Sequence, residues 1–209
     1  MRRVAGAPAL VTRAAAPGRV LPRAFYRRDS REVAVALLNK VLVGADGRSG
    51  RIVETEAYCG ALDPAAHTYR GKTARNATMF GPAGHLYVYF SYGMHWCCNA
   101  VCGETGEGIA VLLRALAPLT GLEAMRLARP KARRDRDLCS GPARLTQAMG
   151  IAGRHDGIDL VTGTGGFRIV DDGTPPPRQP VSTGRVGISR AIGEPWRWYV
   201  PGDVNVSRR

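Results

Sequence analysis

Lysine is scarce in this chain of 209 residues, and its scarcity limits the chemistry that the protein can perform. Of 30 basic residues only Lys40, Lys72 and Lys131 are lysines; the others are arginines. Few amines are therefore available for Schiff-base chemistry. None lies in the strand motifs described below, which leaves no lysine there to act as a lyase nucleophile.

Paired cysteines and long apolar runs are also missing. The five cysteines are odd in number and have neither a C-x-x-C motif nor the Cys/His spacing of a zinc site. Three of them, within 97–102, could in principle bind a metal ion, but adjacent cysteines in an apolar stretch are typical of a core. No segment approaches the about 20 apolar residues that cross a bilayer, and the N-terminus lacks a signal-peptide core. The sequence therefore predicts a soluble protein with reduced, packed thiols and no membrane association.

Positive charge and apolar residues are abundant. The chain carries 30 basic and 17 acidic residues, a formal net charge of +13. This excess favours binding to polyanions such as nucleic acids, although a solvated basic surface explains it equally well. With 44% hydrophobic residues, the length suits one domain with a sizeable core.

The chain divides into an N-terminal arm and one domain. Residues 1–24 are rich in Arg and Ala and contain no acidic residue, which predicts a disordered basic arm; an organelle transit peptide can have the same composition. We expect the domain at 25–207 and a short tail at 208–209. Its first element is a helix over 29–40, indicated by Asp29 and Glu32 at capping-box spacing and by the apolar stripe that follows.

Short apolar segments separated by Gly- and Pro-rich stretches predict an antiparallel sheet. Segments 86–90 and 96–101 flank Tyr92-Gly93-Met94, which indicates a hairpin with Tyr92 at its tip. The composite is an α+β fold: a single compact domain with a curved antiparallel β-sheet, peripheral helices and a protruding β-hairpin. Further strands are expected at 41–43, 51–58, 109–115, 158–161, 167–170, 186–190 and 196–200, and further helices at 120–128, opened by a second capping box of Thr120 and Glu123, and at 142–149.

Two carboxylates share a face of the strand at 51–58. Residues two apart lie on the same side of a strand, so Glu54, Glu56 and Tyr58 should line one face. A carboxylate pair beside a tyrosine suits hydrolysis of a glycosidic bond, in which one carboxylate activates water or stabilises an oxocarbenium-like centre. Glu54 is better explained as part of a solvent-facing strand edge, which makes Glu56 the candidate catalyst.

Several aromatic and polar side chains are candidates for a binding slot. Tyr58, His67 and Tyr89 could stack on a flipped base, while Tyr87 is assigned to the core. Core packing for Tyr89 and a hydrogen-bonded loop position for His67 are the alternatives. Tyr92 at the hairpin tip could wedge into a base stack or fold back onto the hairpin, and the amide of Asn99 could simply bond to backbone.

Taken together, these stretches resemble the alkyladenine (3-methyladenine) DNA glycosylase family. The motifs are long, dispersed and in order, and they cover nearly the whole domain, from about Phe25 to Ser207. They are Glu54-Thr55-Glu56-Ala57-Tyr58, Ala65-Ala66-His67-Thr68, Arg75-Asn76, Met79-Phe80, Leu86-Tyr87-Val88-Tyr89, Tyr92-Gly93-Met94, Asn99, Val111-Leu112-Leu113-Arg114-Ala115, Ser140-Gly141-Pro142-Ala143 and Arg185-Val186-Gly187-Ile188.

The resemblance implies a role for each matching position. Glu56 matches the general base that activates water for attack at the sugar C1′, and Arg114 matches a residue that helps to position this water and the phosphate of the flipped nucleotide. Tyr92 matches the residue that enters the minor groove and fills the vacated space. The base pocket implied by the same matches comprises Tyr58, His67, Tyr89, Asn99, which is set against the guanine amino group, Ala65, Ala66 and Met94.

The function implied is that of a monofunctional DNA glycosylase in base excision repair. It would remove alkylated or deaminated purines from double-stranded DNA as a monomer, without a metal or an organic cofactor. A bacterial cytoplasmic protein, nucleoid-associated when bound to DNA, is expected, with an organelle or the nucleus as alternatives. Two other functions remain open: a catalytically inactive lesion- or DNA-binding protein on the same fold, and a metal-dependent hydrolase that uses His67, His95 and the glutamates.

Overall fold

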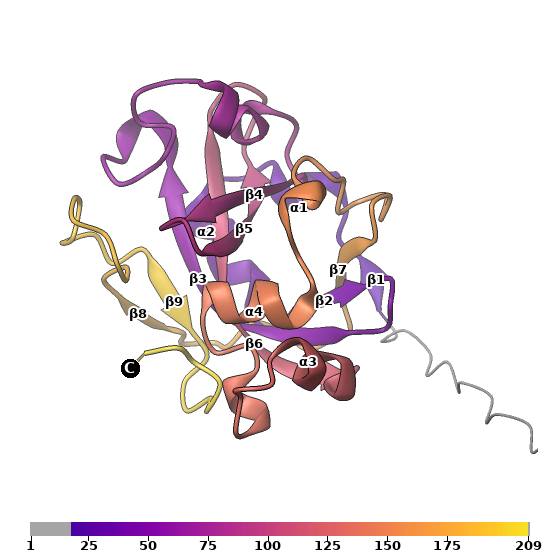
Figure 1. Cartoon of the computed structure of the whole chain (residues 1–209). Helices are drawn as coiled ribbons and strands as arrows, with labels where there is room; N and C mark the ends of the chain where they lie inside the picture. Colours follow the sequence, from indigo (N-terminus) through magenta and orange to yellow (C-terminus); the bar gives the residue numbers. More distant parts are fainter. Residues whose placement is uncertain (1–17, 209) are drawn as a thin grey trace, which may run out of the picture.

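A curved antiparallel sheet of nine strands organises residues 18–208, which are described by a computed structural model (Figure 1). Its main path runs in the order β1-β7-β2-β3-β6-β5-β4, and β9 pairs with β3 on one side and β8 on the other. The strands are β1 (Arg19–Val20), β2 (Val41–Gly44), β3 (Ser49–Cys59), β4 (Leu86–Ser91), β5 (His95–Cys102), β6 (Ile109–Thr120), β7 (Phe167–Asp171), β8 (Val181–Thr183) and β9 (Arg197–Tyr199).

Helices are short and lie around the sheet (Figure 1). The α-helices are α1 (Arg23–Tyr26), α2 (Ser30–Leu37), α3 (Leu122–Ala128) and α4 (Pro142–Met149). Four 3-10 turns connect the elements: η1 (Gly60–Leu62), η2 (Ala74–Phe80), η3 (Asp135–Asp137) and η4 (Gly153–His155). This arrangement confirms the predicted α+β class with a curved antiparallel sheet.

Helix α2 decides which face of β3 is available for chemistry. Asp29 caps the helix by accepting a hydrogen bond from the backbone N–H of Arg31 at 2.8 Å. The helix packs against β3, where the Thr55 hydroxyl donates to the Ala34 carbonyl at 2.9 Å. Because side chains alternate along a strand, Glu54 and Glu56 lie on the opposite face from Thr55.

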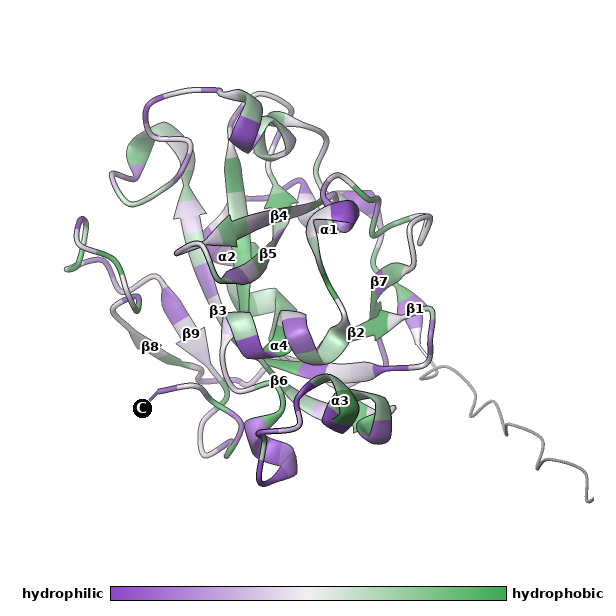
Figure 2. Ribbon diagram, in the orientation of Figure 1, coloured by the Kyte–Doolittle hydropathy of each residue, from purple (hydrophilic) through white to green (hydrophobic). Residues whose placement is uncertain are grey.

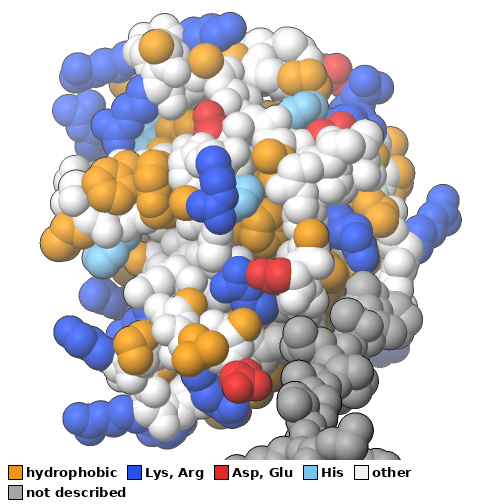
Figure 3. Space-filling view, turned by 45° about the vertical axis from the view of Figure 1, so that its right-hand side comes forward, with side chains coloured by type: hydrophobic (Ala, Val, Ile, Leu, Met, Phe, Trp, Pro, Cys, Tyr) orange, Lys and Arg blue, Asp and Glu red, His pale blue; other side chains and the backbone are white. Residues whose placement is uncertain are grey.

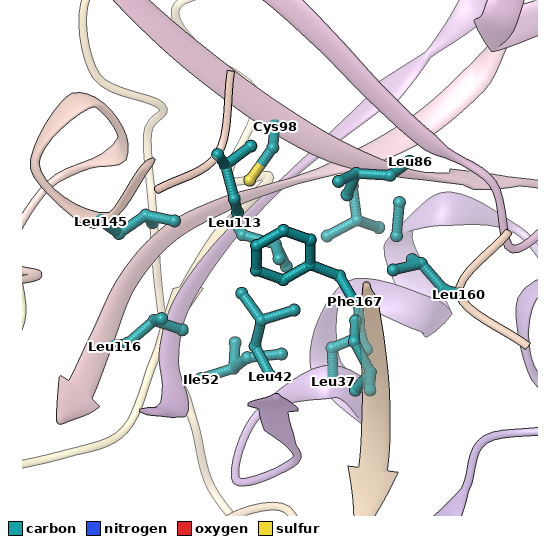
Figure 4. Packing of buried hydrophobic residues seen from close by; sticks show 14 of the residues in the cluster. Leu37, Leu42, Ile52, Leu86, Cys98, Leu113, Leu116, Leu145, Leu160 and Phe167 are labelled. Carbon is teal, nitrogen blue, oxygen red and sulfur yellow. The ribbon is translucent and has the colours of Figure 1, made fainter. Parts of the chain in front are cut away.

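Apolar side chains from the sheet, α2 and α4 form one main core (Figure 4). Leu37, Leu113 and Leu145 are fully buried in it, and Phe167 packs at its centre. Figure 2 shows hydrophobic residues concentrated along the central strands and hydrophilic residues on the peripheral turns. The core thus fixes the long central strands that carry the polar residues of the site.

The hairpin β4–β5 forms as predicted. Ser91 pairs with His95, and Met94 donates from its backbone N–H to the Ser91 carbonyl at 3.1 Å. Tyr92 and Gly93 occupy the turn with φ of 52° and 66°. Glycine tolerates this left-handed region, whereas tyrosine adopts it at a cost. The hairpin tip is therefore a shaped turn that presents Tyr92.

Several predicted elements are absent or differently bounded. Segments 158–161 and 186–190 form no strand, and α2 ends at Leu37 rather than at residue 40. Thr120 does not cap α3, because its hydroxyl accepts from or donates to Ser49 at 2.6 Å inside the sheet and Gly121 precedes the helix instead. Strand β8 was not anticipated within the Pro-rich segment 171–184.

Among the described residues, regular secondary structure begins before the predicted boundary at residue 25. Strand β1 pairs with β7, with Arg19 opposite Asp171, and α1 covers residues 23–26. The remainder of the predicted arm, residues 1–17, lies outside the described residues. At the other end, Arg208 belongs to the fold through a hydrogen bond from Arg197 to its carbonyl.

Within residues 18–208 no helix has the length and apolar character needed to cross a membrane.

Truncation of a central core residue should cost much of the stability. Leu113→Ala removes a fully buried side chain from β6, and we expect the free energy of unfolding to fall by about 2–5 kcal/mol. Leu127→Ala, at a position that is 77% exposed, is the matched control and should change it by less than about 0.5 kcal/mol. Urea unfolding of both variants measures the difference, and similar losses would contradict the assignment of the core.

Candidate functional site

A pocket of about 760 Å³ opens beside the hairpin β4–β5. Its walls come from the end of β3, the loop after it, the strands β4 to β6 and the irregular segment 186–190. This size suits a small ligand. Seven of the predicted site residues line the pocket: Tyr58, Ala65, His67, Tyr89, Tyr92, Asn99 and Arg114.

Three predicted residues do not line it. Ala66 is buried at 8% exposure behind Ala65, and Met94 is 68% exposed at the hairpin tip. Glu56 is fully buried one layer behind the wall. The structure therefore brings the pocket residues together but places Met94 away from the cavity.

Aromatic rings form one wall of the pocket. Tyr87 and Tyr89 stack with centroids 5.4 Å apart, and His67 meets Tyr89 edge-on at 4.5 Å. The Nδ1 atom of His67 is 3.2 Å from the hydroxyl of Tyr87, a hydrogen-bond distance. Partial desolvation in the pocket and the nearby charge of Arg75 lower the pKa of His67, which favours its neutral form. Tyr87 is buried, as its assignment to the core required, but it also lines the pocket.

Glu56 bonds directly to three residues that line the pocket. Its carboxylate accepts from the hydroxyl of Tyr58 at 3.0 Å and from the backbone N–H of Val186 at 2.7 Å. Arg114 Nη1 is 3.0 Å from Glu56 Oε1. Burial raises the pKa of Glu56, and Arg114, Val186 and Tyr58 oppose this rise only in part. A carboxylate with a raised pKa inside a pocket wall is suited to proton transfer.

Glu54 does not face solvent, contrary to the preferred interpretation of the strand. It is fully buried, with Oε1 accepting from Arg114 Nε at 2.8 Å and from Arg197 Nε at 2.7 Å. Ser207 adds its backbone N–H at 2.7 Å and its hydroxyl at 2.9 Å. Although burial alone would raise the pKa of Glu54, the Arg114 charge and these hydrogen bonds bring it below its usual value. The pattern missed this because β9 and Ser207 lie far along the chain.

Arg114 reaches both glutamates because the β3–β6 register is irregular. Glu54 pairs with Ala115 and Thr55 pairs with Leu113, so Arg114 is an extra residue between them. Such a bulge bends the strand and redirects the side chain of the extra residue. Glu54 stays ionised and Glu56 is driven toward protonation, so one arginine serves two carboxylates with opposite pKa shifts.

Asn99 provides an unsatisfied amide in the pocket. It is 4% exposed on β5, opposite Leu112 of β6, and lines the cavity. Among the described residues its Nδ2 has no hydrogen-bond partner. Buried amides are nearly always paired, so this donor is free for a ligand in the pocket.

Tyr92 stands at the pocket rim. Its side chain is 81% exposed, and its hydroxyl donates to the Gly187 carbonyl at 3.4 Å. The tip of the hairpin and the segment 186–190 therefore approach each other across the opening. An exposed aromatic at this place is available to a partner molecule.

The sequence pattern did not identify the residues that fix the pocket segment 186–190. Arg185 and Asp63 form an ion pair at 2.5 and 2.8 Å with both side chains at 0% exposure. They are separated by 122 positions, and no local spacing links them. The only sequence signal is the motif that begins at Arg185, and the pattern there predicts a strand at 186–190.

Residues 18–208 contain no group of three or more His, Cys, Asp or Glu side chains arranged to hold a metal ion. His67 lines the pocket, whereas His95 is exposed at the start of β5. Both glutamates are already bound by Arg114. The described part of the chain thus offers no ligand set for the metal-dependent alternative.

Comparison with known proteins connects this geometry to a family. The family model of methylpurine-DNA glycosylases matches residues 24–204. The chain belongs to the methylpurine-DNA glycosylase family. Members are DNA glycosylases, hydrolases of N-glycosyl bonds in base excision repair, and the substrate of this one is DNA with alkylated purines. The resemblance seen in the dispersed motifs is confirmed.

Curated relatives of this chain support its membership of the methylpurine-DNA glycosylase family. A protein of Burkholderia lata is 66% identical over 191 residues, which cover 91% of this chain and 92% of the relative. Proteins of Agrobacterium fabrum and Methanoculleus marisnigri are 47% and 49% identical over 198 residues, or 90% of this chain and 93% and 99% of the relatives. All three carry the name "Putative 3-methyladenine DNA glycosylase".

Loss of the Glu54 charge should destabilise the protein. Glu54→Gln leaves the buried guanidinium groups of Arg114 and Arg197 without this counter-charge, and we expect the free energy of unfolding near neutral pH to fall by about 3–5 kcal/mol. The pKa of Glu54 is lowered in the folded protein, so its stabilisation is present above the ordinary value of 4.5 and is lost as the pH falls through the folded-state pKa. Urea unfolding at several pH values should show the difference shrinking in acid.

The control for this experiment is Asp135→Asn, which removes the exposed pair between Asp135 and Arg126. It should change the free energy of unfolding by less than about 1 kcal/mol. Equal effects of the two substitutions would show that Glu54 is not a buried counter-ion.

Proposed function

We propose that this chain is a monofunctional glycosylase that flips a damaged purine out of double-stranded DNA and hydrolyses its N-glycosidic bond with water activated by Glu56. The observation that carries the proposal is the position of Glu56: fully buried, directly behind Tyr58 and Arg114 of the pocket wall. A base in a duplex cannot enter a pocket without leaving the stack.

The proposed reaction follows from the contacts of Glu56. The attacking water lies between this carboxylate and C1′, loses a proton to Glu56 and bonds to C1′ through its oxygen. The electrons of the C1′–N bond leave with the base. Arg114 at 3.0 Å opposes the rise in the pKa of Glu56 and so favours the ionised form that accepts a proton. The product is an abasic site.

Recognition of the base is assigned to the aromatic wall and to the free amide. Tyr58, Tyr89 and the neutral ring of His67 offer stacking and edge contacts to a flat purine. Asn99 presents the one buried side-chain amide nitrogen of the described residues that has no partner. Cationic alkylated bases leave readily, whereas deaminated purines such as hypoxanthine are neutral and need a proton as well. The proposal includes both classes.

The protein surface suits double-stranded DNA. Figure 3 shows Lys and Arg side chains around most of one face, with few Asp and Glu. Three exposed arginines line the pocket itself: Arg70, Arg75 and Arg190. Phosphates bound there would release counterions, so the affinity should fall steeply with salt. We further propose that the protein acts as a monomer in the bacterial cytoplasm.

The proposal of a monofunctional enzyme has support in the lining of the pocket. No lysine is among the described residues that line it, and Lys72 stands outside in the loop after β3. Without an amine at C1′, water is the available nucleophile.

Replacement of the proposed base should abolish excision. Wild type is incubated with duplexes that carry a single ethenoadenine or hypoxanthine, with chelator present, and alkali reveals abasic sites. We expect strand breaks with wild type and none with Glu56→Gln, which keeps the shape of the side chain but cannot accept the proton of the water. Both proteins should bind the duplex equally.

Retained excision by the variant would remove Glu56 from this role. If wild type itself produces no breaks on these duplexes or on methylated DNA, yet binds them in a salt-dependent manner, the inactive DNA-binding alternative is correct. Activity that disappears in chelator would instead support metal chemistry.

Removal of the exposed ring at the hairpin tip should slow excision from duplexes. Tyr92→Ala deletes a side chain that is 81% exposed, so the fold should be unaffected. If the ring fills the space of the flipped base, the single-turnover rate on a duplex should fall by about tenfold or more, with a smaller loss on single-stranded DNA. Leu127→Ala, at a position that is 77% exposed and outside the pocket lining, controls for lost apolar surface. Equal losses on both substrates would contradict a wedge.

A further inference from the structure

Arg185 is an anchor in a segment whose other residues are exposed or only half-buried. It is the only residue between 181 and 192 that is buried, and the segment around it has no regular secondary structure beyond β8. The positions that follow, from Val186 to Arg190, line the pocket, but Arg185 itself does not. A side chain that is buried behind a pocket wall can set the position of that wall without touching the ligand.

The contacts of Arg185 define its orientation. Its two terminal nitrogens donate to Asp63 Oδ2 and Oδ1 at 2.5 and 2.8 Å, and Nη1 also donates to the Ala57 carbonyl at 3.0 Å. The guanidinium lies 4.7 Å from the ring centroid of Tyr58 and 5.0 Å from that of Trp196. A planar group held by paired hydrogen bonds and by two aromatic contacts has little freedom to rotate.

Asp63 connects this anchor to the loop that follows β3. Its carboxylate also accepts from the backbone N–H groups of Cys59 at 3.2 Å and Ala65 at 3.0 Å. These bonds shape the loop that leaves β3 at Gly60, where φ is 61° and an added Cβ would lie 2.5 Å from a backbone oxygen. The same loop delivers Ala65 to the pocket. One ion pair therefore connects two segments of the pocket lining that are distant in sequence, the loop after β3 and segment 186–190.

We propose that Arg185, clamped by Asp63, is a positioning residue for the reaction, because it holds the backbone N–H of Val186 on the Glu56 carboxylate and fixes both pocket walls around it. The inference rests on the proposed function of Glu56. Val186 directly follows Arg185, and its N–H donates to Glu56 Oε1 at 2.7 Å.

Stability alone does not account for this arrangement. A buried ion pair is often no more stabilising than well-packed apolar residues, because both charges lose their hydration. The Nε of Arg185 also has no hydrogen-bond partner among the described residues, which adds to the cost. What the pair provides is a defined direction, since two parallel hydrogen bonds fix a guanidinium against a carboxylate.

The N–H of Val186 matters because it lowers the pKa of Glu56 against the effect of burial. Several other groups act on Glu56 or lie beside it, and one of them, Tyr58, also contacts Arg185. They are Glu54 and Tyr58 on β3, Arg114 on β6, Cys97 on β5 and Arg197 on β9, whose backbone pairs with Glu56. A displaced Val186 should therefore raise the pKa of Glu56 further.

The test is the conservative variant Arg185→Lys, which keeps the positive charge beside Asp63 but loses the paired hydrogen bonds and the ring contacts. We measure the single-turnover excision rate across pH, with thermal unfolding in parallel. We expect a folded protein whose maximal rate falls roughly tenfold to a hundredfold, since small displacements of catalytic groups have effects of this size. The acidic limb of the pH profile should move to higher pH.

Arg23→Lys is the matched control, because Arg23 makes a partly buried pair with Asp159 at 2.6 Å and lies outside the pocket lining. It should leave the rate and the limb unchanged. A folded Arg185→Lys protein with the wild-type rate and an unmoved limb would overturn the proposal, and loss of stability alone would assign Arg185 a purely structural role.

Amide hydrogen exchange of the wild-type protein tests the anchor even if the variant does not fold. The N–H of Val186 should exchange slowly, like those of β3, while its exposed neighbours Gly187 and Ser189 exchange quickly. Fast exchange at Val186 would refute the clamp. Wild-type inactivity would refute the proposed function instead, whereas slow exchange at Val186 would still support the anchor.

Discussion

The contact of Arg114 with two buried glutamates is the constraint on which the rest of the structure depends. A charge without water is costly unless it is paired, so Glu54, Glu56 and Arg114 must be brought together for the fold to exist. The pairing requires the irregular register between β3 and β6, and it requires Arg197 and Ser207 from the end of the chain to complete the shell of Glu54. Distant segments are thereby fixed around one point.

The same principle separates the tasks of the two carboxylates. Glu54 accepts four hydrogen bonds and has a lowered pKa, so it acts as a permanent counter-ion. Glu56 has fewer donors and a raised pKa, so it is the one that can exchange a proton. Its remaining contacts come from Tyr58 and Val186, which line the pocket on segments that are distant in sequence. The position of these two segments and the protonation of Glu56 are thus linked.

Local patterns predicted much of the fold. Alternation and Gly-rich turns located the hairpin with Tyr92 at its tip, and α4 covers the predicted residues 142–149, after which Gly150 has a φ of 73°. They failed where distant contacts decide. Thr120 has the spacing of a helix cap but bonds to Ser49 in the sheet, and the apolar run after Arg185 remains irregular because its anchor is an ion pair rather than a strand partner.

The sequence by itself determined the family, the α+β class and the residue types of the site, because dispersed motifs and local periodicity are written in the order of the residues. Tertiary structure decided which carboxylate has a lowered pKa and which has a raised one. Glu54 and Glu56 look alike on a strand, and only the approach of Arg197, Ser207 and Val186 gives them opposite pKa shifts. A pKa depends on burial and on neighbouring charges in space, and neither can be inferred from spacing along the chain.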